Sequence, residues 1–162
     1  MDLSWNLPED TAAIEKRVGE SRWLRVMTVR VRPGHVPAYE ENLKALKAAF
    51  EKGGNPNPGF VSQVVAGQPA GVFYITGFGK SLADFDPAPG AKPLRELMGE
   101  EGYDRFQKIQ AESVLMSESD IARLVPELSN PTEGIAKADP EFWNPKPAAP
   151  AAAKPKPAKT GM

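Results

Sequence analysis

The 162-residue chain contains no cysteine and only one histidine, His35. The absence of cysteine excludes disulfides, thiolate metal sites, iron–sulfur clusters and cysteine nucleophiles. With one histidine, a transition-metal site would need carboxylates or a second subunit to complete its ligand set. We therefore predict no metal and no cofactor.

The chain also lacks a large net charge and a long apolar run. The chain has 20 Lys and Arg residues and 21 Asp and Glu residues, so the net charge is -1. We therefore predict no nucleic-acid partner. No stretch reaches the ~20 apolar residues of a membrane-spanning helix, and the N-terminus has no basic region followed by an apolar one. The default expectation is a soluble, cytoplasmic protein, although an exported form whose signal peptide has been removed would carry the same sequence.

Residues 144–162 consist mostly of Pro, Ala and Lys. This composition buries too little apolar surface to offset the entropy of ordering, so we predict a disordered tail. Its lysines allow contact with an anionic surface or a protein partner, and a solvent-exposed tail without a partner is the default interpretation. The segment 131–143 before the tail is predicted to be extended and anchored through Phe142 and Trp143, on the domain or on a partner.

The remaining roughly 130 residues suit one domain. Leu7, Thr11, Ile14 and Val18 follow helical spacing and predict a helical extension within residues 1–21. The periodicity of the apolar residues and the positions of glycine and proline then predict the strands and helices of residues 22–130. The predicted elements are a strand at 23–31, a helix at 37–52, strands at 60–65 and 72–78, a helix at 103–114 and a strand at 120–126.

This order, β-α-β-β-α-β after a leading helix, is typical of a ferredoxin-like α+β domain. In that fold two helices cover one face of a four-stranded antiparallel sheet, and the other face stays bare. A bare face with apolar residues must be covered, most simply by a second copy. We therefore predict a homodimer.

Two short motifs carry a family resemblance. The first is Val-Arg-Val-Arg-Pro-Gly-His at residues 29–35, which runs into the helix at Tyr39 and Glu40, and the second is Pro-Gly-Phe at residues 58–60. With these motifs the chain resembles, over residues 22–128, the dimeric α/β-barrel superfamily of antibiotic-biosynthesis monooxygenase-like, EthD-like and NIPSNAP-like proteins. The resemblance implies the same fold and dimer, and activities that range from cofactor-free oxygenation and haem degradation to no known reaction.

Side-chain alternation supplies the candidate site residues. It directs Met27, Val29 and Val31 toward the helices, and Thr28 and Arg30 toward the open face, where Tyr74 and Thr76 join them. Arg30 with Tyr74 can orient an anionic or phenolic ligand in an apolar cavity between facing sheets. The alternative is an interface salt bridge and a tyrosine hydrogen bond.

His35 is the remaining candidate, because an imidazole can act as a general base near neutral pH. Catalytic members of the superfamily use Asn, Trp or His inside the barrel, whereas His35 lies at the turn after the first strand. A solvated residue at a helix start is the alternative interpretation of this histidine.

We therefore predict a homodimeric protein that binds a small apolar or aromatic ligand, or acts on one. The alternative is a non-catalytic interaction or assembly protein that uses the sheet face and the C-terminal segment. A third alternative, a cofactor-free monooxygenase with an aromatic substrate, is implied by the resemblance alone and predicts oxygen consumption without added metal or flavin.

Overall fold

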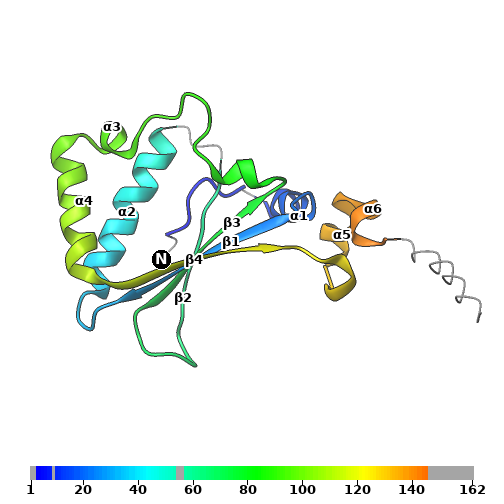
Figure 1. Ribbon diagram of the computed structural model, residues 1–162, viewed down its shortest axis with the longest axis horizontal. Coiled ribbons are helices and arrows are strands. Elements are labelled where there is room, and N and C mark those ends of the chain that lie inside the picture. The colour runs from blue at the N-terminus through cyan, green and yellow to red at the C-terminus, as the bar shows by residue number, and fades with distance from the viewer. Residues whose placement is uncertain (1–2, 9, 54–56, 146–162) are drawn as a thin grey trace, which may run out of the picture.

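Four antiparallel strands form the centre of the protein (Figure 1). The structure, a computed structural model, describes residues 3–8, 10–53 and 57–145, so the predicted tail lies outside the described residues from position 146 onward. The strand order is β2-β3-β1-β4, which is the ferredoxin-like topology that the sequence predicts. The strands are β1 (Trp23–Val31), β2 (Phe60–Gln63), β3 (Val72–Gly79) and β4 (Val114–Arg123).

The helices gather at the two ends of this sheet (Figure 1). At one end lie α2 (Val36–Lys52), α3 (Leu94–Met98) and α4 (Glu100–Ser113). At the other end lie α1 (Thr11–Gly19), α5 (Glu133–Ala138) and α6 (Pro140–Trp143). Two short 3-10 turns, η1 (Leu82–Phe85) and η2 (Pro126–Leu128), follow β3 and β4. No helix in the described ranges is long and apolar enough to cross a membrane.

The hydrophobic core lies under α2. Tyr39 and Leu43, one turn apart on this helix, are buried together with Val29 and Phe73 of the sheet. The Tyr39 and Phe73 rings pack with their centroids 5.1 Å apart. Burial of each such side chain stabilises the fold by about 1.5–3 kcal/mol, so this cluster fixes α2 on β1 and β3.

The second long helix, α4, packs beside α2 instead of spreading over the sheet. The Asn42 amide of α2 donates hydrogen bonds to the Phe106 carbonyl oxygen (3.2 Å) and to Gln110 Oε1 (3.1 Å) of α4. β4 stays exposed from Leu115 to Arg123. The helix side of the sheet is therefore filled at the α2 end and left open further along the strands.

Two predicted boundaries are wrong. The final helix was expected to reach Val114 and the final strand to begin at residue 120, but α4 ends at Ser113 and β4 begins at the next residue. Val114 pairs with Val31 across the sheet, and this long-range partner overrides a local helical spacing. At the other end of the chain, α1 begins at Thr11 because the Asp10 carboxylate accepts a hydrogen bond from the Ala13 amide (2.6 Å) and caps the helix.

The segment 131–143, predicted to be extended, contains α5 and α6. Thr132 and Asp139 cap the two helices by accepting hydrogen bonds from the amides of Ile135 (3.4 Å) and Phe142 (3.2 Å). α5 packs closely on α1, where a Cβ at Gly19 would lie 2.4 Å from the Ile135 carbonyl oxygen. The first and last described helices thus form one small cluster beside the ends of β1 and β4.

Candidate functional site

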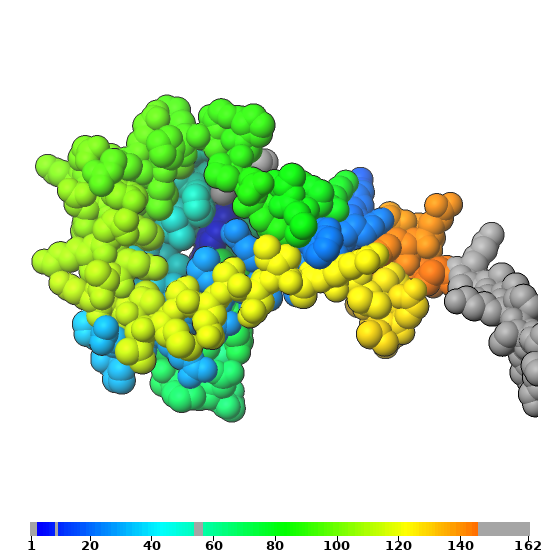
Figure 2. Space-filling view, viewed as in Figure 1, coloured from blue at the N-terminus to red at the C-terminus, as the bar shows by residue number. Residues whose placement is uncertain are grey.

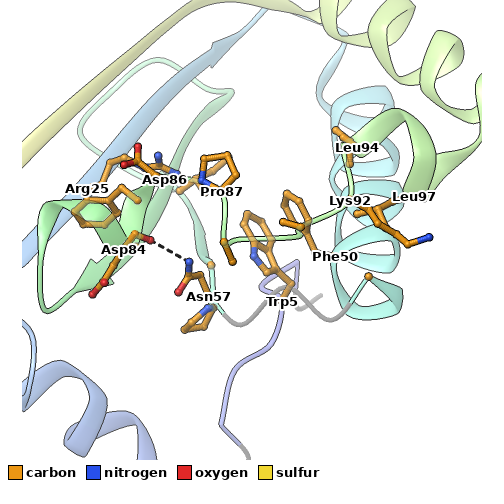
Figure 3. Close-up of a pocket in the computed structure, with 18 of the residues that line it drawn as sticks. Trp5, Arg25, Phe50, Asn57, Asp84, Asp86, Pro87, Lys92, Leu94 and Leu97 are labelled. Carbon is orange, nitrogen blue, oxygen red and sulfur yellow. Dashed lines mark hydrogen bonds between the residues drawn. The ribbon is translucent and has the colours of Figure 1, made fainter.

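A cavity of about 810 Å³ opens on the helix side of the sheet, in the part that α2 does not fill. Figure 2 shows the surface hollowed between the α2 and α4 end and the sheet, with the N-terminal segment at the bottom of the hollow. Inward-facing residues of β1 and β3 form the floor, among them Arg25, Met27, Ile75 and Gly77. The cavity is long, since Arg25 lies at one end of the lining and Leu94 and Leu97 lie at the other (Figure 3).

The first wall comes from the N-terminal segment. Trp5 pairs with Gly59 through two backbone hydrogen bonds (3.1 and 3.0 Å), and Ser4 Oγ accepts a hydrogen bond from the Val61 amide (3.0 Å). The indole packs on Phe50 of α2, with ring centroids 5.2 Å apart. A Cβ at position 59 would lie 2.1 Å from the indole, so only glycine admits Trp5 in this place.

The second wall is the turn after β3. The Asp84 carboxylate accepts hydrogen bonds from the amides of Lys80 (2.6 Å) and Ser81 (3.2 Å) and from the Ser81 hydroxyl (3.0 Å). The hydrogen bond from the Ser81 amide is the largest of the effects that lower the pKa of Asp84 from its ordinary value. The Asn57 amide donates to the Asp84 carbonyl oxygen (3.0 Å), which ties this turn to the segment before β2 (Figure 3). The wall that carries Phe85 is thereby held in place.

Arg25 is a cation in an otherwise largely apolar floor. Its guanidinium carbon lies 5.5 Å from the centroid of the Phe85 ring, and the side chain is half-buried. Its cross-strand neighbours, Gly77 and Ile121, carry no charge. Among residues 3–8, 10–53 and 57–145, no carboxylate lies within ion-pair distance of Arg25 and no side-chain hydrogen bond reaches it.

The predicted site residues lie on the other face of the sheet. Thr28 pairs directly with Tyr74, and the neighbouring pairs place Arg30 and Thr76 on the same face. The Tyr74 hydroxyl accepts a hydrogen bond from Gln68 Nε2 (3.1 Å), and Arg30 Nε is buried without a hydrogen-bond partner in the described structure. The register therefore places the four residues on one face of the sheet, and of these four only Thr76 also borders the cavity.

His35 belongs neither to the cavity nor to the group of four predicted residues on the open face. It occupies the cap position before α2, where its side chain makes no capping hydrogen bond, and it does not line the cavity. Within the described part of the chain, no three His, Asp or Glu side chains come together as a metal-binding group.

Phe142 and Trp143 dock on the chain itself. The Trp143 indole is buried and donates a hydrogen bond to the Gly19 carbonyl oxygen (2.7 Å). The Arg22 guanidinium lies over the Phe142 ring, 3.8 Å from its centroid, and also binds the Asp139 carboxylate. A partner could use these two aromatic residues only after these contacts were released.

Sequence reasoning missed the cavity, although two signals for it are present. Arg25 is a charged residue at an inward position of a strand, where an apolar side chain would serve the core better. Gly59 directly precedes one strand and Gly77 lies inside another, and such glycines often mark a close approach of another group. Trp5 gave no signal, because only the folded chain brings it beside Gly59.

Comparison with known proteins identifies two similar solved structures. One is the protein PA3566 from Pseudomonas aeruginosa, with 18% identity and a TM-score of 0.42 over 64% of this chain and 94% of that one. The other is a NIPSNAP family protein with unknown function from Agrobacterium tumefaciens, with 18% identity and a TM-score of 0.42 over 65% of this chain and 89% of that one. No family model and no curated protein matches the chain.

Proposed function

We propose that this protein binds a small, largely apolar molecule in the cavity between the sheet and α2. The observation that carries the proposal is the cavity itself, whose volume of about 810 Å³ lies within the range usual for ligand sites. The rings of Trp5, Phe50 and Phe85 line it. Aromatic walls favour an apolar or aromatic ligand.

Local features keep this cavity from closing. Trp5 is held by the backbone pair with Gly59, and the turn with Phe85 is held through Asp84. Gly77 leaves the floor without a side chain, and a Cβ built there would meet only Phe85, at 3.8 Å. A site that is already formed binds a ligand at a low cost in conformational entropy.

The test uses 2-naphthamide, a neutral aromatic probe, and the variant Gly77→Val. Valine suits a strand and places two methyl groups in the floor of the cavity, so we expect at least about tenfold weaker binding in calorimetry with an unchanged fold. Ser62→Val is the matched control, because Ser62 is exposed on the open face and its replacement leaves the cavity unchanged. Absence of binding to the wild-type protein, or equal binding by Gly77→Val, would overturn the proposal.

We further propose that the functional unit is a homodimer in which the open faces meet. Leu24, Val26, Phe60 and Phe78 lie half-buried on this face, and the last two pack edge to face with ring centroids 5.5 Å apart. The face also carries Arg30 on β1 and two exposed carboxylates, Glu118 and Asp120, on β4. Two copies related by a two-fold axis can bring these opposite charges together while they cover the apolar residues.

Size-exclusion chromatography with light scattering tests the dimer. We expect a dimer at micromolar concentration and a monomer for Val26→Glu, which buries a charge in the interface. Gln63→Glu, on the other face and exposed, serves as the control and should remain dimeric. A wild-type protein that elutes as a monomer would rule out this arrangement, and with it a ligand site between facing sheets at Thr28, Arg30, Tyr74 and Thr76.

A further inference from the structure

We infer that the molecule bound in the cavity carries a carboxylate, or a similar planar oxyanion, at the end that meets Arg25. This inference rests on the proposed binding function and adds the charge and orientation of the ligand. It begins from the position of Arg25, whose side chain is half-buried on the cavity floor together with the apolar Met27 and Ile75. A guanidinium in such surroundings loses hydration, and an anionic partner is the usual compensation.

The structure supplies no such partner from the described residues. Four charged residues line the cavity: Arg25, Asp84, Asp86 and Lys92. The Asp84 carboxylate accepts hydrogen bonds from Lys80 and Ser81, and Lys92 forms an ion pair with Glu96. Asp86 is exposed and lies beyond ion-pair distance of Arg25. Arg25 is therefore the lining cation whose charge is left for a ligand.

The ring of Phe85 leaves the hydrogen-bond donors of Arg25 available to a ligand. A guanidinium that lies near an aromatic ring keeps N–H donors along its edge, and these donors match the two oxygens of a carboxylate. The rest of the lining suits the body of the ligand, because Trp5 and Phe50 follow along the cavity and Leu94 and Leu97 close its other end (Figure 3). The geometry points to an elongated aromatic or aliphatic acid, with its acid group at β1 and its apolar part toward α3.

The test compares 2-naphthoate with 2-naphthamide, which has nearly the same shape and no charge. We expect the wild-type protein to bind naphthoate about tenfold more tightly than naphthamide in calorimetry, as a charge-assisted hydrogen bond predicts. Arg25→Met keeps the length and apolar character of the side chain, so it should remove this preference and retain naphthamide binding. Arg25→Lys should retain part of the preference.

Arg95→Met is the matched control, because it removes the same residue type and charge from an exposed position that does not line the cavity. It should keep the naphthoate preference of the wild-type protein. Binding of naphthamide without a preference for naphthoate, or a preference that survives Arg25→Met, would overturn the inference and leave the binding function standing. Binding of neither probe would overturn both.

Discussion

The indole N–H of Trp143 donates a 2.7 Å hydrogen bond to the backbone carbonyl oxygen of Gly19, which lies 124 residues earlier in the chain. Both residues are buried, and they join α6 to the end of α1. Trp143→Phe keeps an aromatic ring but removes the donor. We expect it to lower the free energy of unfolding in urea by about 1–3 kcal/mol, since the carbonyl oxygen then lacks this partner.

Asn144→Ala is the control for that prediction, because Asn144 is exposed and follows Trp143 directly. Its effect should stay within about 0.5 kcal/mol. A Trp143→Phe variant as stable as the wild-type protein would show that this hydrogen bond contributes nothing to the stability of the domain.

The ion pair of Arg22 with Asp139 makes the same cluster sensitive to acid. The hydrogen bond from Arg22 is the largest effect that lowers the pKa of Asp139 from its ordinary value of 3.8. A carboxyl whose pKa is lower in the folded state contributes stability above its unfolded pKa and loses it as the pH falls through the folded pKa. The stability that Asp139 adds should therefore be constant near neutral pH and decline below about pH 4.

Asp139→Asn isolates this contribution, since asparagine can still cap α6. The measurement is the difference in the free energy of unfolding between the wild-type protein and the variant at a series of pH values. The difference should shrink only at the acid end of the series. A difference that is independent of pH down to pH 2 would contradict the assigned role of Arg22.

The burial of Tyr39 predicts a loss of folding stability at alkaline pH. Burial raises the pKa of Tyr39 from 10.0 to about 12, and the chain has only two other tyrosines. A group whose pKa is higher in the folded state contributes stability that is complete below its unfolded pKa and is lost as the pH rises through the folded pKa. Folded protein should therefore lose stability between pH 10 and about pH 12.

Absorbance of tyrosinate in the ultraviolet measures this directly. We expect Tyr39 to ionise near pH 12, together with unfolding. In Tyr39→Phe this step should disappear. If the ionisation step that Tyr39→Phe removes lies near pH 10 in the folded protein, the burial of Tyr39 under α2 would be contradicted.

The contact of Trp5 with Gly59 predicts strong coupling between the two positions. Gly59→Ala should destabilise the protein by about 1–3 kcal/mol, because the new methyl group overlaps the indole. The same change in a Trp5→Ala background should cost less than about 0.5 kcal/mol, since the overlapping ring is gone. Denaturant unfolding of the four proteins gives the coupling energy, and additive effects would show that the ring does not pack there.

The topology and the division of the sheet into two faces follow from the sequence. Strict alternation in β1 and β3 was enough to place Thr28 with Tyr74, because a strand has a side-chain period of two. The start of β4 was not predictable in this way. Val114 continues the helical spacing of α4, and only its pairing with Val31 makes it the first residue of the strand.

The candidate site was harder to predict than the fold. Its lining comes from segments as far apart as Trp5 and Leu97, and no local pattern states that these segments meet. The prediction also assumed that the helices fill their side of the sheet. Because α4 packs on α2 instead, the space above Arg25 and Gly77 stays open.

The close fit of the indole on a bare backbone also constrains how this sequence can diverge. The residues at positions 5 and 59 constrain each other, since a side chain at 59 is compatible only with a smaller residue at 5. Related sequences should therefore substitute the two positions together, and those that keep the pair should also keep the wall of the cavity. Covariation of these two distant positions would mark the relatives that share the ligand site, independently of their overall similarity.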